Sequence, residues 1–158
     1  MTLVVRRATD ADAAQISGVL IASITQLCAA DHGDDPAIIA SWTRNKSPDG
    51  VLEMLHNPGL AMLVAERDGA VAAVGCSRHS GEIALNYVSP AHRFAGASKA
   101  VLAAMEQELR DQGATVATLT STATARRFYR SAGWEDTGPP ETGHLVVGYP
   151  MRKVLDAG

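Results

Sequence analysis

The sequence predicts an α/β (α+β) protein with a mixed central sheet of six or seven strands flanked by about four helices. Three observations lead to this class. Apolar residues recur at helical spacing over residues 9–28, and they change to strand-like runs over residues 60–88. A strand, a long helix and another strand then follow one another over residues 82–120. Because that connection places its two strands parallel, the sheet should combine antiparallel and parallel pairs.

Composition limits the class of protein further. The chain has 158 residues, of which 46% are hydrophobic and 20% charged, so we expect one globular domain over residues 1–158. A net charge of -3 gives no basic footprint, and nucleic acid is not an expected partner. No segment has the pattern of a signal peptide or a membrane span, which favours a cytoplasmic protein without membrane contact. Cys28 and Cys76 lie in apolar segments and are expected to be buried and unpaired.

The first third of the chain predicts one strand followed by three helices. An apolar strand covers residues 3–8, and Thr9 with an acidic residue three positions later has an N-cap pattern. The apolar face of the helix that follows repeats every three or four residues until about Cys28. Asp35-Pro36 and Ser47-Pro48 each place a capping side chain before a proline, which is typical of the first turn of a helix.

The rest of the chain predicts an antiparallel meander and then a parallel unit. Residues 60–66 and 70–78 are strands joined by an Asp-Gly turn, a strong hairpin signal, and residues 82–88 supply a third strand. The helix that follows Gly96 ends at Gly113. Further elements are then expected: a strand over residues 115–120, a helix over residues 124–132, and strands at Trp134 and residues 144–151.

The loop between the strand at residues 82–88 and the next helix predicts an anion site. A helix N-terminus offers backbone N–H groups without intrahelical partners and the positive end of the helix dipole. The residues at this point are small, namely Gly96, Ala97 and Ser98, so that a pyrophosphate can approach the backbone closely. We therefore expect a phosphorylated cofactor to bind here.

Two motifs resemble the GCN5-related N-acetyltransferase (GNAT) superfamily. YVSPAHRFAGAS at residues 87–98 is similar to the acetyl-CoA loop of that family, with Arg93 and Gly96 in matching positions and Ser98 as the last small residue. TATARRFYRSAGW at residues 122–134 is similar to the Ala-x-x-Phe-Tyr-x-x-x-Gly-aromatic signature of the following helix. Thr122 or Thr124 stands where the family often has asparagine.

The resemblance implies that acetyl-CoA is the cosubstrate. No metal is expected, because the five scattered histidines and two distant cysteines do not have the spacing of metal ligands. Acetyl transfer to a small-molecule or peptide amine would then occur by direct attack in a ternary complex. The residues expected to bind the cofactor are Tyr87, Val88, Arg93, Phe94, Ala95, Gly96, Ala97, Ser98, Thr122 and Thr124. Three arginines at residues 126, 127 and 130 either meet the 3′-phosphate of coenzyme A or form the solvated face of their helix.

Two residues are the catalytic candidates that the resemblance implies. Tyr129 is the expected general acid, because a phenol is protonated at neutral pH and can donate to the leaving thiolate; alternatively it packs against the sulfur or hydrogen-bonds it without transferring a proton. Glu82 matches the position of the glutamate base in some members, although a glutamate at a strand start is usually solvated. His79 and His32 are the other candidates for the base.

The acceptor site is the least defined part of the prediction. Asp31 and His32 begin the acidic segment DHGDDP, which either attracts a cationic amine or only caps helices. Trp42 either lines the same cleft or belongs to the core. A non-catalytic acyl-CoA-binding regulatory module on the same fold is the alternative function, and a homodimer is compatible with either.

Overall fold

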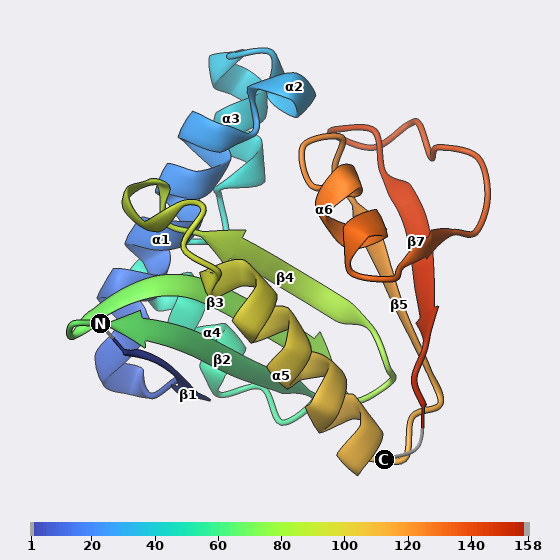
Figure 1. Cartoon of the computed structure of the whole chain (residues 1–158). Helices are drawn as coiled ribbons and strands as arrows, with labels where there is room; N and C mark the ends of the chain where they lie inside the picture. Colours follow the sequence, from blue (N-terminus) through green and yellow to red (C-terminus); the bar gives the residue numbers. More distant parts are fainter. Residues whose placement is uncertain (1, 157–158) are drawn as a thin grey trace.

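Two antiparallel sheets carry the fold. The computed structural model describes residues 2–156, and both ends of the predicted domain, Met1 and residues 157–158, lie outside this part. The larger sheet has the order β1-β2-β3-β4, and the smaller one has the order β5-β7-β6 (Figure 1). Their strands are β1 (Leu3–Arg7), β2 (Leu60–Arg67), β3 (Ala70–Arg78), β4 (Ile83–Val88), β5 (Val116–Ser121), β6 (Glu135–Asp136) and β7 (Tyr149–Val154).

Among the described residues, a single parallel bridge joins the two sheets, between Glu82 and Thr118. There the Thr118 N–H donates to the Gly81 carbonyl at 3.0 Å, and beyond it β4 and β5 diverge (Figure 1). The prediction of one central sheet is therefore wrong, and the predicted parallel unit exists only at this point. The pairing of β4 with β3 slips by one residue at Ala84, and such a bulge increases strand twist and turns β4 away from β5.

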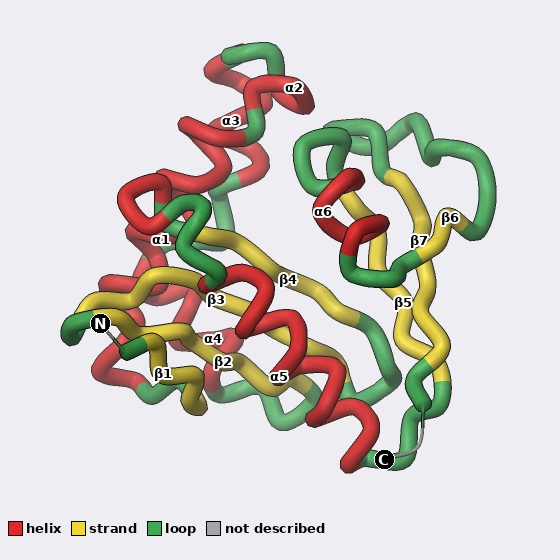
Figure 2. Tube along the Cα trace, in the orientation of Figure 1, coloured by secondary structure: helices red, strands yellow, loops and turns green. Residues whose placement is uncertain are grey.

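Helices cover both faces of the larger sheet (Figure 2). Their number in residues 2–156 exceeds the predicted four or so. α1 and α4 share one buried cluster with β2 and β3, whereas α5 packs in a second cluster on the opposite face. Within residues 2–156, no helix is long and apolar enough to cross a membrane. The helices are η1 (Asp10–Asp12), α1 (Ala13–Leu27), α2 (Ala29–His32), α3 (Pro36–Trp42), α4 (Pro48–Leu55), η2 (Pro90–His92), α5 (Ala97–Asp111) and α6 (Arg126–Ser131).

Local capping chemistry sets the helix starts much as the sequence indicates. The Asp35 carboxylate accepts from the Ala37 N–H at 2.9 Å, which begins α3. The Ser47 hydroxyl accepts from the Gly50 N–H at 3.1 Å, which begins α4. Each cap satisfies a donor that the first helical turn leaves without a partner.

The position of α5 depends on a missing side chain in β3. A Cβ atom added at Gly75 would lie 2.4 Å from Cγ1 of Val101 and 2.7 Å from the terminal methyl of Met105. Only glycine therefore allows α5 to approach the sheet this closely. Directly after Met105, the buried Glu106 carboxylate accepts from Lys153 Nζ at 2.8 Å and from the Trp134 indole N–H at 3.2 Å. These contacts tie α5 to the smaller sheet.

The last strand lies later in the chain than predicted. β7 begins at Tyr149 and pairs with β5 along its whole length, from Val116 opposite Val154 to Ser121 opposite Tyr149. Much of the apolar run predicted as a strand over residues 144–151 is instead part of a loop, in which Leu145 is 45% exposed. Full pairing with β5 selects the later register, because it satisfies the backbone of both strands.

Candidate active site

A cavity of about 560 Å³ opens where β4 and β5 diverge. Its wall combines β4, the start of α5, the end of β5 and α6, with the end of α1 closing one side. The first motif of the sequence therefore lies opposite the second. The cavity is lined by nine of the residues predicted to contact the cofactor, namely Tyr87, Val88, Arg93, Phe94, Gly96, Ala97, Ser98, Thr122 and Thr124.

The loop before α5 brings backbone and small side chains to the cavity. Gly96 is the N-cap of α5 with a φ of 82°, a left-handed conformation that glycine adopts without strain. The first turn of α5 then leaves N–H groups available at the cavity wall. Phe94 also has a positive φ, of 65°, and its ring is 91% exposed beneath the Arg93 guanidinium. Ala95 does not line the cavity.

The charged side chains that line this cavity are all cationic. Arg93, Lys99 and Arg127 belong to the wall, and no aspartate or glutamate lines it within the described residues. The other two arginines of the predicted cluster have a different role. Arg126 and Arg130 both pair with the Asp136 carboxylate, at 3.4 Å and 2.6 Å. Of that cluster, only Arg127 is placed to meet an anion in the cavity.

Tyr129 projects from α6 into the same cavity and is only 6% exposed. Burial raises the pKa of Tyr129 to about 12, while a hydrogen bond from the Asn86 side chain acts in the opposite direction. The ring is held edge to face against Trp134, with the centroids 6.0 Å apart. The phenol is therefore fixed in place and stays protonated at neutral pH.

The exposed edge of β4 provides a second polar surface. β4 is the outermost strand of its sheet, and within the described residues its only bridge to β5 is at Glu82. From there to Val88, the backbone edge that faces the cavity has no strand partner. An extended chain carrying amide groups can pair with such an edge as another strand would. The backbone at Tyr87 and Val88 lies at the wide end of this opening.

Asp31 does not face an open acceptor site. Its carboxylate accepts from the Ala123 N–H at 2.7 Å and from the N–H and hydroxyl of Thr124 at 3.2 and 2.5 Å. It thereby fastens α2 to the turn before α6. The prediction that Asp31 attracts a cationic amine is not supported by this placement, because the backbone of a neighbouring segment already neutralises part of its charge.

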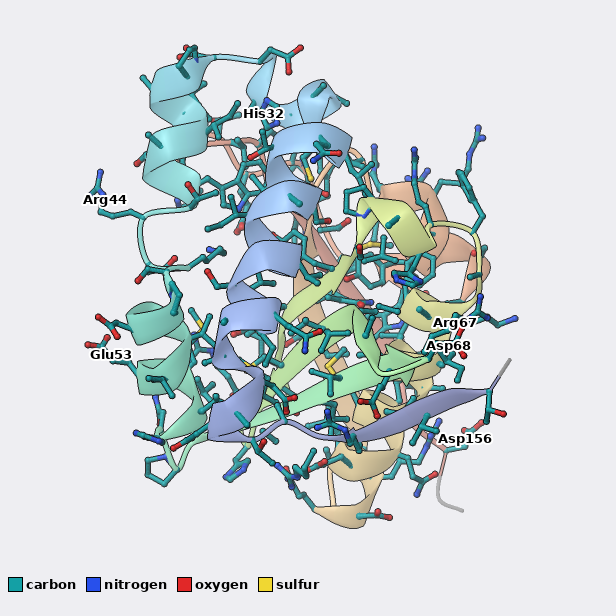
Figure 3. The ribbon with its side chains drawn as sticks, turned by 90° about the vertical axis from the view of Figure 1, so that its left-hand side faces the viewer. His32, Arg44, Glu53, Arg67, Asp68 and Asp156 are labelled. Atoms are coloured by element: carbon teal, nitrogen blue, oxygen red, sulfur yellow. The ribbon has the colours of Figure 1, made fainter. Side chains whose placement is uncertain are left out.

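His32 and His79 lie outside the cavities described here. His32 is 2% exposed and sits among α1, α2 and α3 (Figure 3). Its Nδ1 accepts from the Asp34 N–H at 3.0 Å, so Nε2 carries the proton and donates to the Ile24 carbonyl at 2.7 Å. With both ring nitrogens in use, His32 is a structural residue and not the predicted base or acceptor contact.

Glu82 lies at the narrow end of the opening and lines neither cavity. Its carboxylate accepts from Arg78 Nε at 2.8 Å, and its side chain is 44% exposed. Its role as base stays a prediction.

A second cavity, of about 300 Å³, adjoins the first. Both are lined by Tyr87, Thr120, Ser121 and Thr122, so the two spaces meet at the end of β5. Trp42 forms one wall of the second cavity, and the loop before β7 forms another through Glu141, His144, Val146, Val147 and Gly148. Glu141 is the only carboxylate in this lining, and no lysine or arginine belongs to it within the described residues.

Sequence reasoning missed Asn86 as a side chain, and it missed Glu141 and His144 altogether. The segment from Gly138 to Gly143 is rich in glycine and proline, which indicates a loop. That loop signal was the available clue, but the apolar residues that follow it suggested a strand instead.

A cysteine nucleophile has little support in the described residues. Burial raises the pKa of the Cys28 thiol to about 11, so it is not an activated nucleophile. Within residues 2–156, no three His, Cys, Asp or Glu side chains are grouped as metal ligands.

Comparison with known proteins identifies the family. The sequence matches the acetyltransferase (GNAT) domain family over residues 19–155, and the chain belongs to this family. A comparison with curated proteins finds no match.

Solved structures share the fold at low sequence identity. A GCN5-related N-acetyltransferase from Rhodopseudomonas palustris is 21% identical, with a TM-score of 0.86 over 98% of this chain and 97% of that one. The PaiA N-acetyltransferase from Thermoplasma acidophilum, solved in complex with coenzyme A, is 18% identical, with a TM-score of 0.84 over 98% and 99%. A ribosomal-protein-alanine N-acetyltransferase from Brucella melitensis is 23% identical, with a TM-score of 0.65 over 96% and 99%.

Proposed function

We propose that this protein is an acetyl-CoA-dependent N-acetyltransferase that acetylates an amine of a small molecule or peptide by direct attack in a ternary complex. One observation carries the proposal. A cavity with three cationic side chains and the buried Tyr129 joins a second cavity, in whose described lining Glu141 is the only acid. Two substrates of opposite charge can therefore each occupy one cavity and meet at the end of β5. The coenzyme A bound to the Thermoplasma acidophilum relative supports the choice of cosubstrate.

The first cavity fits coenzyme A in its chemistry. Arg93, Lys99 and Arg127, together with the N-terminus of α5, would hold its phosphates. The unpaired edge of β4 would hold the peptide-like pantetheine arm. When bound, acetyl-CoA supplies an activated acetyl thioester. The backbone N–H of Val88 would polarise the thioester carbonyl as its oxygen gains charge.

Tyr129 would act as the general acid. Because burial raises the pKa of Tyr129 to about 12, its hydroxyl keeps its proton throughout the neutral range and can donate it to the thiolate that leaves. The aromatic contact with Trp134 keeps the ring in one orientation.

The acceptor amine would occupy the second cavity. Its ammonium form is attracted to Glu141, and Trp42 and Tyr87 offer apolar and aromatic surface to the rest of the molecule. Before attack the ammonium must lose a proton. Glu82 remains our candidate for the base, and because it does not line the cavity it can take that proton only through intervening water.

The decisive experiment is a screen of an amine library with acetyl-CoA, in which the free thiol of coenzyme A is measured. We expect turnover with at least one primary amine, and mass spectrometry of that product should show a single added acetyl group. Calorimetry of coenzyme A binding runs in parallel. Tight binding of coenzyme A without turnover on any amine would favour the alternative, a regulatory module that binds acyl-CoA without catalysis.

A further inference from the structure

Asn86 carries a buried acceptor without a partner in the wall of the first cavity. The residue lies in β4 opposite Gly75 of β3, and it lines the cavity wall. Its Oδ1 atom is buried and has no hydrogen-bond partner among residues 2–156. A buried carbonyl oxygen without a partner is uncommon in folded proteins, because it loses its hydrogen bonds to water without compensation. Its placement in a ligand-sized cavity therefore points to a donor that a ligand supplies.

The other half of the same amide faces Tyr129. The Asn86 side chain is within hydrogen-bonding reach of the Tyr129 hydroxyl, and both residues line one cavity. Asn86 lowers the pKa of Tyr129, which is the effect of a donor near the phenol oxygen, so Nδ2 rather than Oδ1 is the half of the amide that acts on it. The phenol then keeps its own hydrogen free to donate elsewhere. Asn86 comes from the larger sheet and Tyr129 from α6, so the contact spans the opening between the two sheets.

We propose that Asn86 is a positioning residue with two tasks: Nδ2 orients the Tyr129 hydroxyl, and Oδ1 accepts a hydrogen bond from an amide N–H of the pantetheine arm. The proposal rests on the proposed use of acetyl-CoA. The amide fits because the pantetheine arm carries secondary amide groups, which are donors, whereas the phosphates at the other end of coenzyme A carry only acceptors at neutral pH. The Asn86 side chain thus adds a contact that only a hydrogen-bond donor can make, beside the unpaired backbone edge of β4.

The turn before α6, on the opposite wall of the cavity, does not supply the contact proposed for Asn86. The turn before α6 has threonines, and both are already used locally: Thr122 Oγ1 accepts from the Ala125 N–H at 3.2 Å, and Thr124 donates to Asp31. Neither offers a carboxamide to the cavity. Asn86 supplies that group from the opposite wall.

The first test separates contact with the pantetheine arm from a general loss of structure. Calorimetry compares coenzyme A with adenosine 3′,5′-bisphosphate, which has phosphates and adenosine but no pantetheine. Asn86→Leu should weaken coenzyme A binding by about three- to tenfold, as expected for one lost hydrogen bond, and should leave bisphosphate binding unchanged. Asn57→Leu, the same change at an exposed turn outside the cavities, should alter neither. Equal weakening of both ligands by Asn86→Leu, or no weakening, would overturn the Oδ1 contact.

A second test examines the task of orienting Tyr129. Asn86→Leu should lower kcat by about tenfold in the wild-type background and by less than about twofold in Tyr129→Phe, because the two residues then act as one unit. The same fold-loss in both backgrounds would overturn the positioning role. If Asn86→Leu unfolds the protein, Asn86→Ala is measured in the same way. A wild-type protein that binds coenzyme A but acetylates no amine would remove the proposed function and still leave the binding test to decide the Oδ1 contact.

Discussion

The two adjoining cavities differ in charge and in the kind of backbone that builds them. The first is lined by cations and formed mainly by strand edges and helix ends, whereas the second has one acid and is formed largely by a loop. Opposite charges attract, so a polyanion and an ammonium would each prefer a different cavity. Under the proposed function, the divergence of β4 and β5 would separate two substrates by charge as well as make space for them.

The largest effect should come from the residue that acts on the leaving group. We expect Tyr129→Phe to lower kcat by about 100-fold, because general acid catalysis is lost while the packing of the ring is kept. Binding of coenzyme A, measured by calorimetry, should change by less than about twofold. Tyr149→Phe is the matched control, since Tyr149 stacks on Arg126 and lines neither cavity. Unchanged acetyl transfer in Tyr129→Phe would contradict its role as acid.

The pH profile of the wild-type enzyme follows from the same residue. The active form of Tyr129 is protonated, and its raised pKa of about 12 means that this form is lost only as pH rises toward that value. Rates should therefore rise with pH as the amine deprotonates and should show no fall up to about pH 10, where an ordinary phenol would already be half ionised. Steady-state measurement of kcat over this pH range tests the prediction. A fall in kcat beginning near pH 9 would show that the pKa of Tyr129 is not raised or that Tyr129 is not the acid.

The next prediction tests whether the Glu141 carboxylate in the second cavity binds the acceptor amine. Glu141→Gln should raise KM for the amine by about tenfold and leave KM for acetyl-CoA unchanged, because the carboxylate faces only the second cavity. Glu53→Gln is the control, with the same loss of charge on the outer side of α4 (Figure 3). An equal rise in KM for both substrates, or none for the amine, would remove Glu141 from the acceptor site.

The two cavities also differ in how well they could be predicted from the sequence. The first cavity could be predicted because its residues lie at element boundaries that leave local patterns, such as the small residues before α5 and the helix at residues 126–131. The acceptor cavity could not, because it brings together Trp42 and Glu141, which are far apart in the chain. Asp31 shows the same limit. Its partners lie about 90 positions away, as the sequence separation of 93 to Thr124 shows, and no local pattern reveals such a pair.

Two arginines of α6 test whether the cations that line the first cavity bind coenzyme A. Arg127 lines the first cavity, whereas Arg130 pairs with Asp136 outside it. Arg127→Gln should weaken coenzyme A binding by about three- to fivefold at low ionic strength, and by less at high salt, because the phosphates are screened. Arg130→Gln should leave the affinity unchanged. Calorimetry at two salt concentrations distinguishes them, and equal losses would mean that only the overall charge of α6 matters.

The smallest effect is expected at Glu82, where the two sheets meet. Its carboxylate is half exposed, paired with Arg78 and outside both cavities, so any proton it takes must travel through water. Glu82→Gln should lower kcat by about two- to threefold at low pH, where loss of the amine proton limits the rate, and should change little at high pH, where the amine is already neutral. Arg78→Gln, which frees the carboxylate, should not reproduce this pattern. Equal activity of Glu82→Gln at every pH would remove it as the base and leave water at the cavity junction as the proton acceptor.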